Sequence, residues 1–215
     1  MQTPETALTF YNANTPNGHK IAIYLHEAGL PHQQVTLDLN QGDQHRPEYL
    51  AINPNGKIPA IVDHAHRVTL FESGAILGYL SARCGHLQPA GLAGQWQVQQ
   101  WLHFQVGGIG PMLGQLWWFL HASPQPNHEA IARYTREALR LYGVVERRLA
   151  ESAHLALDDY SIADIAAFPW LRTHGELQLD LAPFPRVRDW LARIDARPAV
   201  RQGLAAARPL AQAEA

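Results

Sequence analysis

Cysteine is almost absent from this chain of 215 residues, in which Cys84 is the single example. One cysteine excludes an intrachain disulfide and a CxxC redox centre, and it is consistent with a reducing compartment. Long apolar runs are missing too: no stretch approaches the roughly 18 apolar residues of a membrane span, and no apolar signal-type segment precedes Ala7. We therefore expect a cytoplasmic protein with no membrane partner.

A strong net charge of either sign is also lacking. Lys and Arg number 17 and Asp and Glu number 19, so the formal net charge is -2. Such a balance leaves no electrostatic footprint for nucleic acid. The 12 histidines are scattered and show no metal-ligand spacing such as H-E-x-x-H. The sequence predicts neither a nucleic-acid partner nor a bound metal.

The pattern of apolar residues changes near residue 86. Before this point, alternating and β-rich runs predict strands over 7–11, 33–39, 60–62 and 68–71, and helical spacing predicts helices over 16–28, 47–51 and 73–83. After it only helical spacing is found, over 95–121, 127–150, 185–196 and 198–207, with a further helix capped by Ser161. The glycines and proline at 107–111 must bend or break the first of these helices.

These patterns predict two domains. Residues 1–85 form an α/β domain with the order βαβαββα, and residues 95–215 form an all-α helical domain. Residues 86–94 contain one proline and two glycines without periodicity, which is typical of a linker. A chain of this length can bury a core in each of two small domains.

One short stretch of the α/β domain combines a turn with a strand. Residues 53–62 contain a Pro- and Gly-rich turn that runs directly into an apolar run. Pro59 falls where the strand begins, a position that suits proline because it has no N–H to donate. The bond from Ile58 to Pro59 can be cis.

A second stretch, ten residues further on, predicts a helix start beside an acid. Ser73 is placed to cap an apolar helix beginning near Gly74. The free N–H groups of a helix start attract a carboxylate, and Glu72 can receive an ammonium group. A site that takes both groups suits an amino-acid-like ligand. Taken singly, the same residues also fit a plain turn, a capped helix and a solvated glutamate.

Together these stretches resemble the glutathione site of the glutathione transferases. Segments 15–20, 53–62, 71–76, 101–115 and 160–165 resemble the Nu class of bacterial glutathione transferases, which are relatives of a fungal nitrogen-regulation protein. The resemblance covers about residues 8–204 and implies a thioredoxin-like N-terminal domain, an all-helical C-terminal domain and a homodimer with each site beside the subunit interface. Nu-class members are known chiefly as glutathione-dependent disulfide-bond oxidoreductases.

The resemblance implies how the tripeptide is held. Pro59 is in cis and aligns the backbone of Ile58 with the cysteinyl unit, while Glu72 and Ser73 hold the γ-glutamyl end. Gln44 lies near the glycyl end, although by sequence alone it is an exposed loop amide.

Two basic residues complete the implied site. Lys57, one of only two lysines, lies near the glycyl carboxylate. The alternative interpretation of Lys57 is that it is only a solvated cation in a loop. Arg133 contacts a second glutathione or the disulfide product. The alternative interpretation is that Arg133 only belongs to a solvated helix face. On that face it lies beside two other arginines and pairs with Glu129 four residues earlier.

The catalytic residues are expected at the first helix. Thr15 followed by Pro16 is a strong helix start. A thiol placed there feels the helix dipole, and a hydroxyl or amide N–H that donates to the thiolate lowers the thiol pKa further. We expect Thr15 to be the main donor with Asn17 as its neighbour. The alternative is that Thr15 only caps the helix, which is worth about 1 kcal/mol.

Glutathione is therefore the expected co-substrate. Because Cys84 is remote in sequence from Thr15, both exchanging sulfurs are expected to come from small molecules, with bound glutathione attacking a disulfide and a second glutathione resolving the mixed disulfide. Two alternatives remain open. The chain could conjugate electrophiles or cleave aryl ethers with the same thiolate, or it could be a non-catalytic glutathione-binding regulator.

Overall fold

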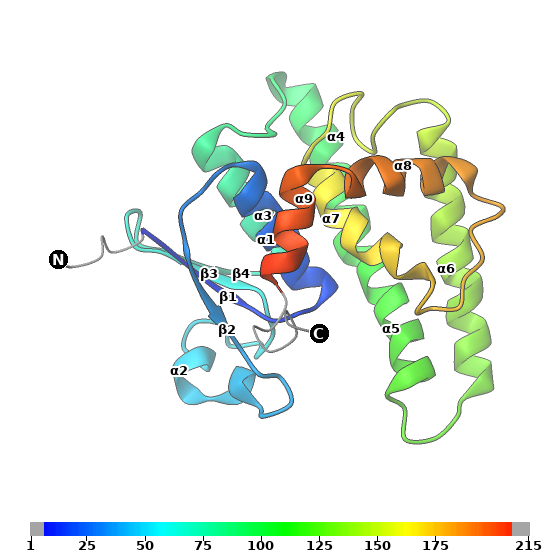
Figure 1. Ribbon diagram of the computed structural model, residues 1–215, viewed down its shortest axis with the longest axis horizontal. Helices are drawn as coiled ribbons and strands as arrows, with labels where there is room; N and C mark the ends of the chain where they lie inside the picture. Colours follow the sequence, from blue (N-terminus) through cyan, green and yellow to red (C-terminus); the bar gives the residue numbers. More distant parts are fainter. Residues whose placement is uncertain (1–6, 208–215) are drawn as a thin grey trace. The chain divides into compact units, whose positions relative to one another are not determined.

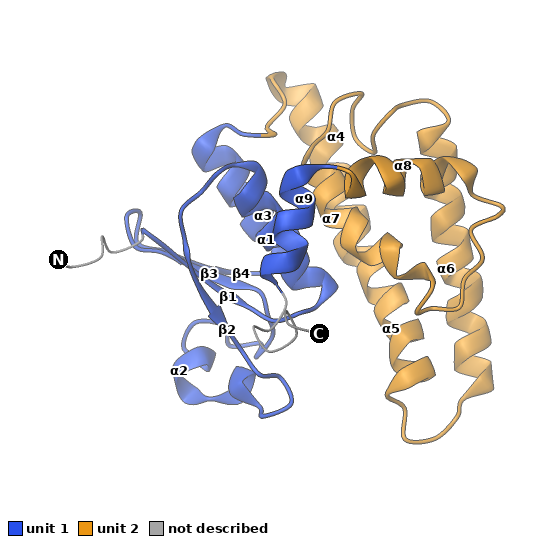
Figure 2. Ribbon diagram, in the orientation of Figure 1, with its two compact units in different colours: residues 1–86, 197–215 blue, residues 87–196 orange. Residues whose placement is uncertain are grey.

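The computed structural model describes residues 7–207, and the chain divides into two compact units, residues 1–86 with 197–215 and residues 87–196 (Figure 2). Parts of the predicted domains, residues 1–6 and 208–215, lie outside the described residues. The first unit begins with β1 (Leu8–Asn12), α1 (Pro16–Glu27), β2 (Gln33–Thr36), the 3-10 turn η1 (Asp43–His45) and α2 (Pro47–Leu50). It continues with β3 (Ala60–Asp63), β4 (Val68–Phe71) and α3 (Ser73–Cys84), which confirms the order βαβαββα.

The four strands form one mixed sheet of order β2-β1-β3-β4. β1 is parallel to β2 and antiparallel to β3, and β3 is antiparallel to β4. This is the predicted thioredoxin-like arrangement, and α1 and α3 pack side by side in it (Figure 1). β2 is shorter than the predicted strand over 33–39. As an edge strand it pairs on one side only, and beyond it Asp38 accepts hydrogen bonds from the next turn instead.

The start of α1 forms as the sequence predicts. The Thr15 side chain accepts a hydrogen bond from the Gly18 N–H at 3.2 Å, and Pro16 occupies the first helical position. Gly29 follows the helix with a φ of 59°, where glycine carries no steric penalty. A local hydrogen bond at the start and a glycine after the end therefore delimit this helix.

The last described helix, α9 (Pro198–Ala206), belongs to the first unit by contacts, whereas chain order predicts it in the helical domain over 95–215. It packs on α1 so closely that a Cβ on Gly203 would lie 2.6 Å from the Ile23 Cα. Arg197, just before the helix, forms an ion pair with Glu27 at 2.6 Å. These two contacts join the end of the described chain to its first helix.

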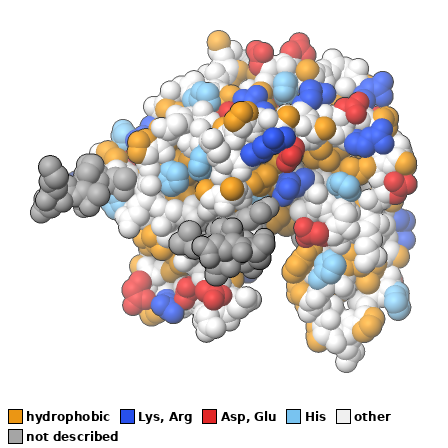
Figure 3. All heavy atoms as spheres, viewed as in Figure 1, with side chains coloured by type: hydrophobic (Ala, Val, Ile, Leu, Met, Phe, Trp, Pro, Cys, Tyr) orange, Lys and Arg blue, Asp and Glu red, His pale blue; other side chains and the backbone are white. Residues whose placement is uncertain are grey.

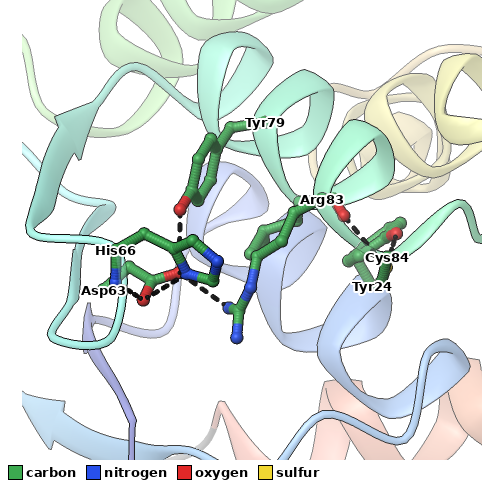
Figure 4. Close-up of polar contacts among 7 residues, drawn as sticks. Tyr24, Asp63, His66, Tyr79, Arg83 and Cys84 are labelled. Atoms are coloured by element: carbon green, nitrogen blue, oxygen red, sulfur yellow. Dashed lines mark hydrogen bonds and ion pairs between the residues drawn. The ribbon is translucent and has the colours of Figure 1, made fainter.

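A buried carboxylate fastens the β3–β4 hairpin to α3 (Figure 4). Asp63 is fully buried, accepts a hydrogen bond from the Tyr79 hydroxyl at 2.8 Å and one from the His66 N–H at 3.1 Å, and pairs with Arg83 at 2.8 Å. Burial alone would raise the pKa of Asp63, but these hydrogen bonds and the Arg83 charge hold that pKa below its ordinary value.

All regular elements of the second unit are helices, and its described residues 87–196 contain no strand. It contains α4 (Gly91–Phe104), the π-helical turn η2 (Gln105–Ile109), α5 (Gly110–His121), α6 (His128–Leu149), α7 (Ile162–Leu171), the 3-10 turn η3 (Arg172–His174) and α8 (Pro185–Asp195). The glycine-rich interruption is the π-helical turn, a feature often found at functional sites. α4 begins at Gly91, inside the segment predicted as a linker. Ser161 and Asp164 form the expected capping box of α7.

Candidate functional site

The strand registers bring four segments of the first unit together at one end of the strands of its sheet. Tyr11 and Phe71 both pair with Ala60, so the residues after β1 and after β4 lie beside those that precede β3. β2 runs parallel to β1, so the segment that follows β2 begins at this same end of the sheet. We call the segments at this end of the sheet the turn cluster. They contain eight of the nine predicted site residues: Thr15, Asn17, Gln44, Lys57, Ile58, Pro59, Glu72 and Ser73.

Thr15 lies at the start of α1, and its hydroxyl group acts there as a hydrogen-bond acceptor. Its oxygen accepts from the Gly18 N–H, and among residues 7–207 nothing accepts a hydrogen bond from it. A hydroxyl has one proton besides its acceptor lone pairs, so Thr15 can cap α1 and still donate outward. Thr15 and Asn17 are both half-buried. The two roles considered for Thr15 are therefore compatible in this geometry.

Ile58 presents an unpaired stretch of backbone. Within the described residues, no hydrogen bond uses its N–H or its C=O, whereas the preceding carbonyl, that of Lys57, accepts from the Asn53 side chain at 2.6 Å and from the Tyr49 hydroxyl. The Ile58–Pro59 bond is cis, as the sequence allowed. An extended peptide could add to this backbone as a further strand.

The two residues expected at the glycyl end differ in exposure. Lys57 is exposed, while the Gln44 amide is half-buried, turned inward, and donates to the Leu39 carbonyl at 3.3 Å. Its Oε1 is buried without a hydrogen-bond partner among the described residues. η1 nonetheless lies against the 53–57 turn, because a Cβ on Gly56 would lie 3.2 Å from the Gln44 carbonyl. The alternative interpretation of Gln44 as an exposed loop amide therefore does not hold.

The prediction that Ser73 caps a helix starting near Gly74 is also wrong. α3 starts at Ser73 itself, and the cap position belongs to Glu72, which has a φ of 73° and makes no side-chain cap hydrogen bond. A non-glycine residue in this region of φ is strained, and such residues cluster at functional sites. Glu72 is exposed and Ser73 is buried. The Ser73 hydroxyl accepts a hydrogen bond from the Lys20 ammonium at 3.0 Å instead of capping the helix.

Lys20 is the residue that sequence reasoning missed. It is only 1% exposed although lysine is almost never fully buried. Burial lowers the pKa of Lys20 from 10.5 to about 7, while the negative charge of Glu72 acts in the opposite direction. The available signal was its position: Lys20 stands one helical turn before the buried Tyr24, on an otherwise apolar face.

Arg133 belongs to the second unit and is not part of the turn cluster. It is exposed on α6, where it lines a cavity of about 430 Å³ together with Tyr134, Arg136 and Arg140. The pair of Glu129 with Arg133, which was part of the alternative interpretation, is not found among the ion pairs of the described residues. Among residues 7–207 the ion pair on this face joins Glu137 to Arg140 at 2.7 Å.

Cys84 lies at the far end of α3 from Ser73. The helix has 12 residues, which separates the two by about 16 Å. The Cys84 thiol donates to the Leu80 carbonyl at 2.9 Å and lies 3.1 Å from the Tyr24 hydroxyl (Figure 4). It is exposed. The only thiol of the chain therefore stands apart from the turn cluster.

Two further properties concern partners. On the face shown in Figure 3, acidic and basic side chains are mixed rather than gathered by sign. Over the described part of the chain, no helix is long and apolar enough to cross a bilayer, and no group of three or more potential metal ligands is found.

Fold and site together define a protein with a thioredoxin-like unit followed by a helical unit. The sequence matches the family "Glutathione S-transferase, N-terminal domain" over residues 6–82 and "Glutathione S-transferase, C-terminal domain" over residues 110–198. It is 48% identical over 202 residues to the disulfide-bond oxidoreductase YfcG of Escherichia coli, an alignment that covers 92% of this chain and 94% of YfcG.

Two solved structures are similar in fold as well as in sequence. A glutathione transferase from Burkholderia graminis, with two glutathione molecules per subunit, has a TM-score of 0.89 and 44% identity, covering 93% of this chain and 88% of its own. A glutathione transferase from Pseudomonas putida, with one glutathione disulfide per subunit, has a TM-score of 0.87 and 38% identity, covering 95% and 93%. The chain therefore belongs to the glutathione S-transferase family, is Nu-like within it, and is a glutathione S-transferase-like enzyme.

Proposed function

We propose that this enzyme is a glutathione-dependent disulfide-bond reductase that acts on small-molecule disulfides. The observation that carries the proposal is the turn cluster. It combines an unpaired backbone at Ile58 with the starts of two helices, and it contains no thiol. Relatives named as a disulfide-bond oxidoreductase and structures holding glutathione or its disulfide support the same chemistry.

The tripeptide is bound along the turn cluster in an extended form. The Ile58 N–H and C=O pair with its cysteinyl unit, as in strand addition. Glu72 receives the γ-glutamyl ammonium, and Ser73 with the N–H groups at the start of α3 receives the γ-glutamyl carboxylate. Lys57 and Gln44 serve the glycyl end. Residues 1–85 thus act as the glutathione-binding domain.

The cysteinyl sulfur then lies at the start of α1. The helix dipole and a hydrogen bond from Thr15, assisted by Asn17, lower the pKa of the glutathione thiol and raise the thiolate fraction. The thiolate attacks one sulfur of the disulfide R–S–S–R, which releases R–S⁻ and leaves the mixed disulfide of glutathione with R.

A second glutathione completes the reaction. Its thiolate attacks the glutathione sulfur of the mixed disulfide, so that oxidised glutathione forms and the second R–S⁻ leaves and takes up a proton. Two electrons pass from two glutathione molecules to one disulfide, so no cysteine of the protein is needed. Arg133 contacts the second glutathione or the disulfide product. We also propose a cytoplasmic homodimer with each site beside the subunit interface, which light scattering of the purified protein would test.

The proposal is tested by turnover of hydroxyethyl disulfide with glutathione. The wild type and Cys84→Ser should be equally active, since both sulfurs that exchange with the substrate come from glutathione. Thr15→Ala should lower the rate about tenfold to a hundredfold and raise the apparent thiol pKa by about 1 to 2 units, because the thiolate loses its hydrogen bond. Thr15→Ser, which keeps both the hydroxyl and the cap, is the matched control and should stay near wild type.

Other outcomes would change the assignment. Loss of activity in Cys84→Ser would refute the use of small-molecule sulfurs only. Much faster reaction with an aryl halide or a β-aryl ether would assign the same thiolate to conjugation or thiolytic cleavage. Binding of glutathione with no turnover of any of these substrates would indicate a glutathione-binding regulator.

A further inference from the structure

A lysine ammonium lies buried directly behind the start of α3. Lys20 reaches from α1, is 1% exposed, and donates to the Ser73 hydroxyl oxygen at 3.0 Å. Burying an ammonium group is unfavourable unless it is hydrogen-bonded or paired. The hydrogen bond to Ser73 therefore connects this ammonium group to the turn cluster, where the γ-glutamyl group is expected to bind.

The direction of this hydrogen bond determines what Ser73 can do. An ammonium group only donates, so the Ser73 oxygen must accept, and its single proton has to point elsewhere. Among residues 7–207 no group accepts that proton. The Ser73 hydroxyl is thereby set as a donor at the start of α3, where the helix N–H groups are donors as well. The Ser73 hydroxyl and these N–H groups then suit an anion, while the Glu72 carboxylate beside them suits a cation.

We propose that Lys20 is a positioning residue for the α-carboxylate of the γ-glutamyl unit. It holds the Ser73 hydroxyl in the orientation that donates to this carboxylate, before the ligand arrives. The inference rests on the proposed function, because it assumes that the γ-glutamyl end is bound by Glu72 and Ser73. Lys20 does not touch the ligand and acts through Ser73, so its effect is confined to one end of the tripeptide.

This confinement makes the role measurable with two ligands. The first is glutathione, and the second is 4-aminobutyryl-cysteinyl-glycine, which is glutathione without the α-carboxylate of its γ-glutamyl unit. Calorimetry at pH 6, where the Lys20 amine carries its proton, gives the dissociation constants for the wild type, Lys20→Met, Ser73→Ala and the double variant. Lys57→Met is the matched control, since it makes the same substitution at the other lysine, which we place at the glycyl end that both ligands share.

Lys20→Met should weaken glutathione binding by about tenfold to a hundredfold, the range expected for a hydrogen bond to a charged group. It should change binding of the analogue by less than about threefold. Lys57→Met should instead weaken both ligands by the same factor. In the Ser73→Ala background, Lys20→Met should add less than about threefold, because the residue through which it acts is gone.

Three results would overturn the inference: no loss with Lys20→Met, an equal loss for both ligands, or full additivity with Ser73→Ala. Urea unfolding followed by circular dichroism verifies that each variant is folded, and Lys20→Leu must repeat the pattern of Lys20→Met. If the wild type bound glutathione but Lys20→Met kept full affinity, only this inference would fail. If the wild type bound neither glutathione nor its disulfide, the proposed function would fail with it.

Discussion

Replacing Lys20 by methionine should raise the free energy of unfolding, by an amount that depends on pH. The Lys20 side chain is fully buried, and burial lowers its pKa from 10.5 to about 7. At 1.36 kcal/mol for each pKa unit, the folded protein is destabilised by about 5 kcal/mol when this ammonium is charged, relative to when it is neutral. Methionine has nearly the same length and no charge, and the lost hydrogen bond from the ammonium to Ser73 offsets about 2 kcal/mol of the gain.

The sign of the pH dependence follows from proton binding. Between pH 7 and 10.5 the unfolded chain keeps the Lys20 proton while the folded protein releases it, so the stability contributed by this residue rises with pH. Below pH 7 both states are protonated and the full penalty applies. The advantage of Lys20→Met should therefore be largest at pH 6 to 7 and shrink by about 2 kcal/mol between pH 7 and 9.

Urea unfolding followed by circular dichroism at pH 6, 7, 8 and 9 measures this difference. Lys57→Met serves as the control, because Lys57 is exposed and its replacement should give a profile parallel to that of the wild type. Parallel profiles for Lys20→Met and the wild type would refute the reasoning, as would a variant that is less stable than the wild type at pH 6. Either result would mean that the buried ammonium is fully compensated.

Three further substitutions test the fold and the site. Asp63→Asn should lower the free energy of unfolding by about 3 kcal/mol, measured by urea unfolding, because it breaks a buried ion pair and leaves its partners unmatched. Glu72→Gly should raise the melting temperature, since glycine removes the strain at a φ of 73°, yet weaken glutathione binding at least about tenfold in calorimetry. Gly203→Val should destabilise by about 3 kcal/mol or more, because its Cβ would collide with the Ile23 backbone.

Each of these has an outcome that contradicts it. Unchanged stability in Asp63→Asn would mean that the hairpin does not depend on the carboxylate charge. A Glu72→Gly variant with full glutathione affinity would remove that residue from the site. Gly107→Ala is the control for Gly203, since a Cβ on Gly107 meets nothing within 4 Å, and equal stability of the two variants would contradict the close packing of α9 on α1.

Features that depend on neighbouring residues could be predicted from the sequence. The Thr15 cap and the Ser161 capping box both form, because their hydrogen bonds join residues two or three positions apart. The same rule failed at Ser73. There the hydroxyl is taken by Lys20, which is 53 positions away in the chain, and Glu72 adopts a backbone conformation that helix-start statistics do not anticipate.

The sequence by itself determined the order of strands and helices, because periodicity, caps and turns are short-range properties. The family and the residue types expected at the site came from the resemblance of its motifs to those of the glutathione transferases. Only the tertiary structure decided which of these residues meet. The strand registers bring the separate turns together at one end of the sheet. The packing of α1 places Lys20 against Ser73 and brings α9 into contact with α1. These contacts join segments distant in the chain, and they depend on how faces pack in three dimensions, which no local pattern encodes.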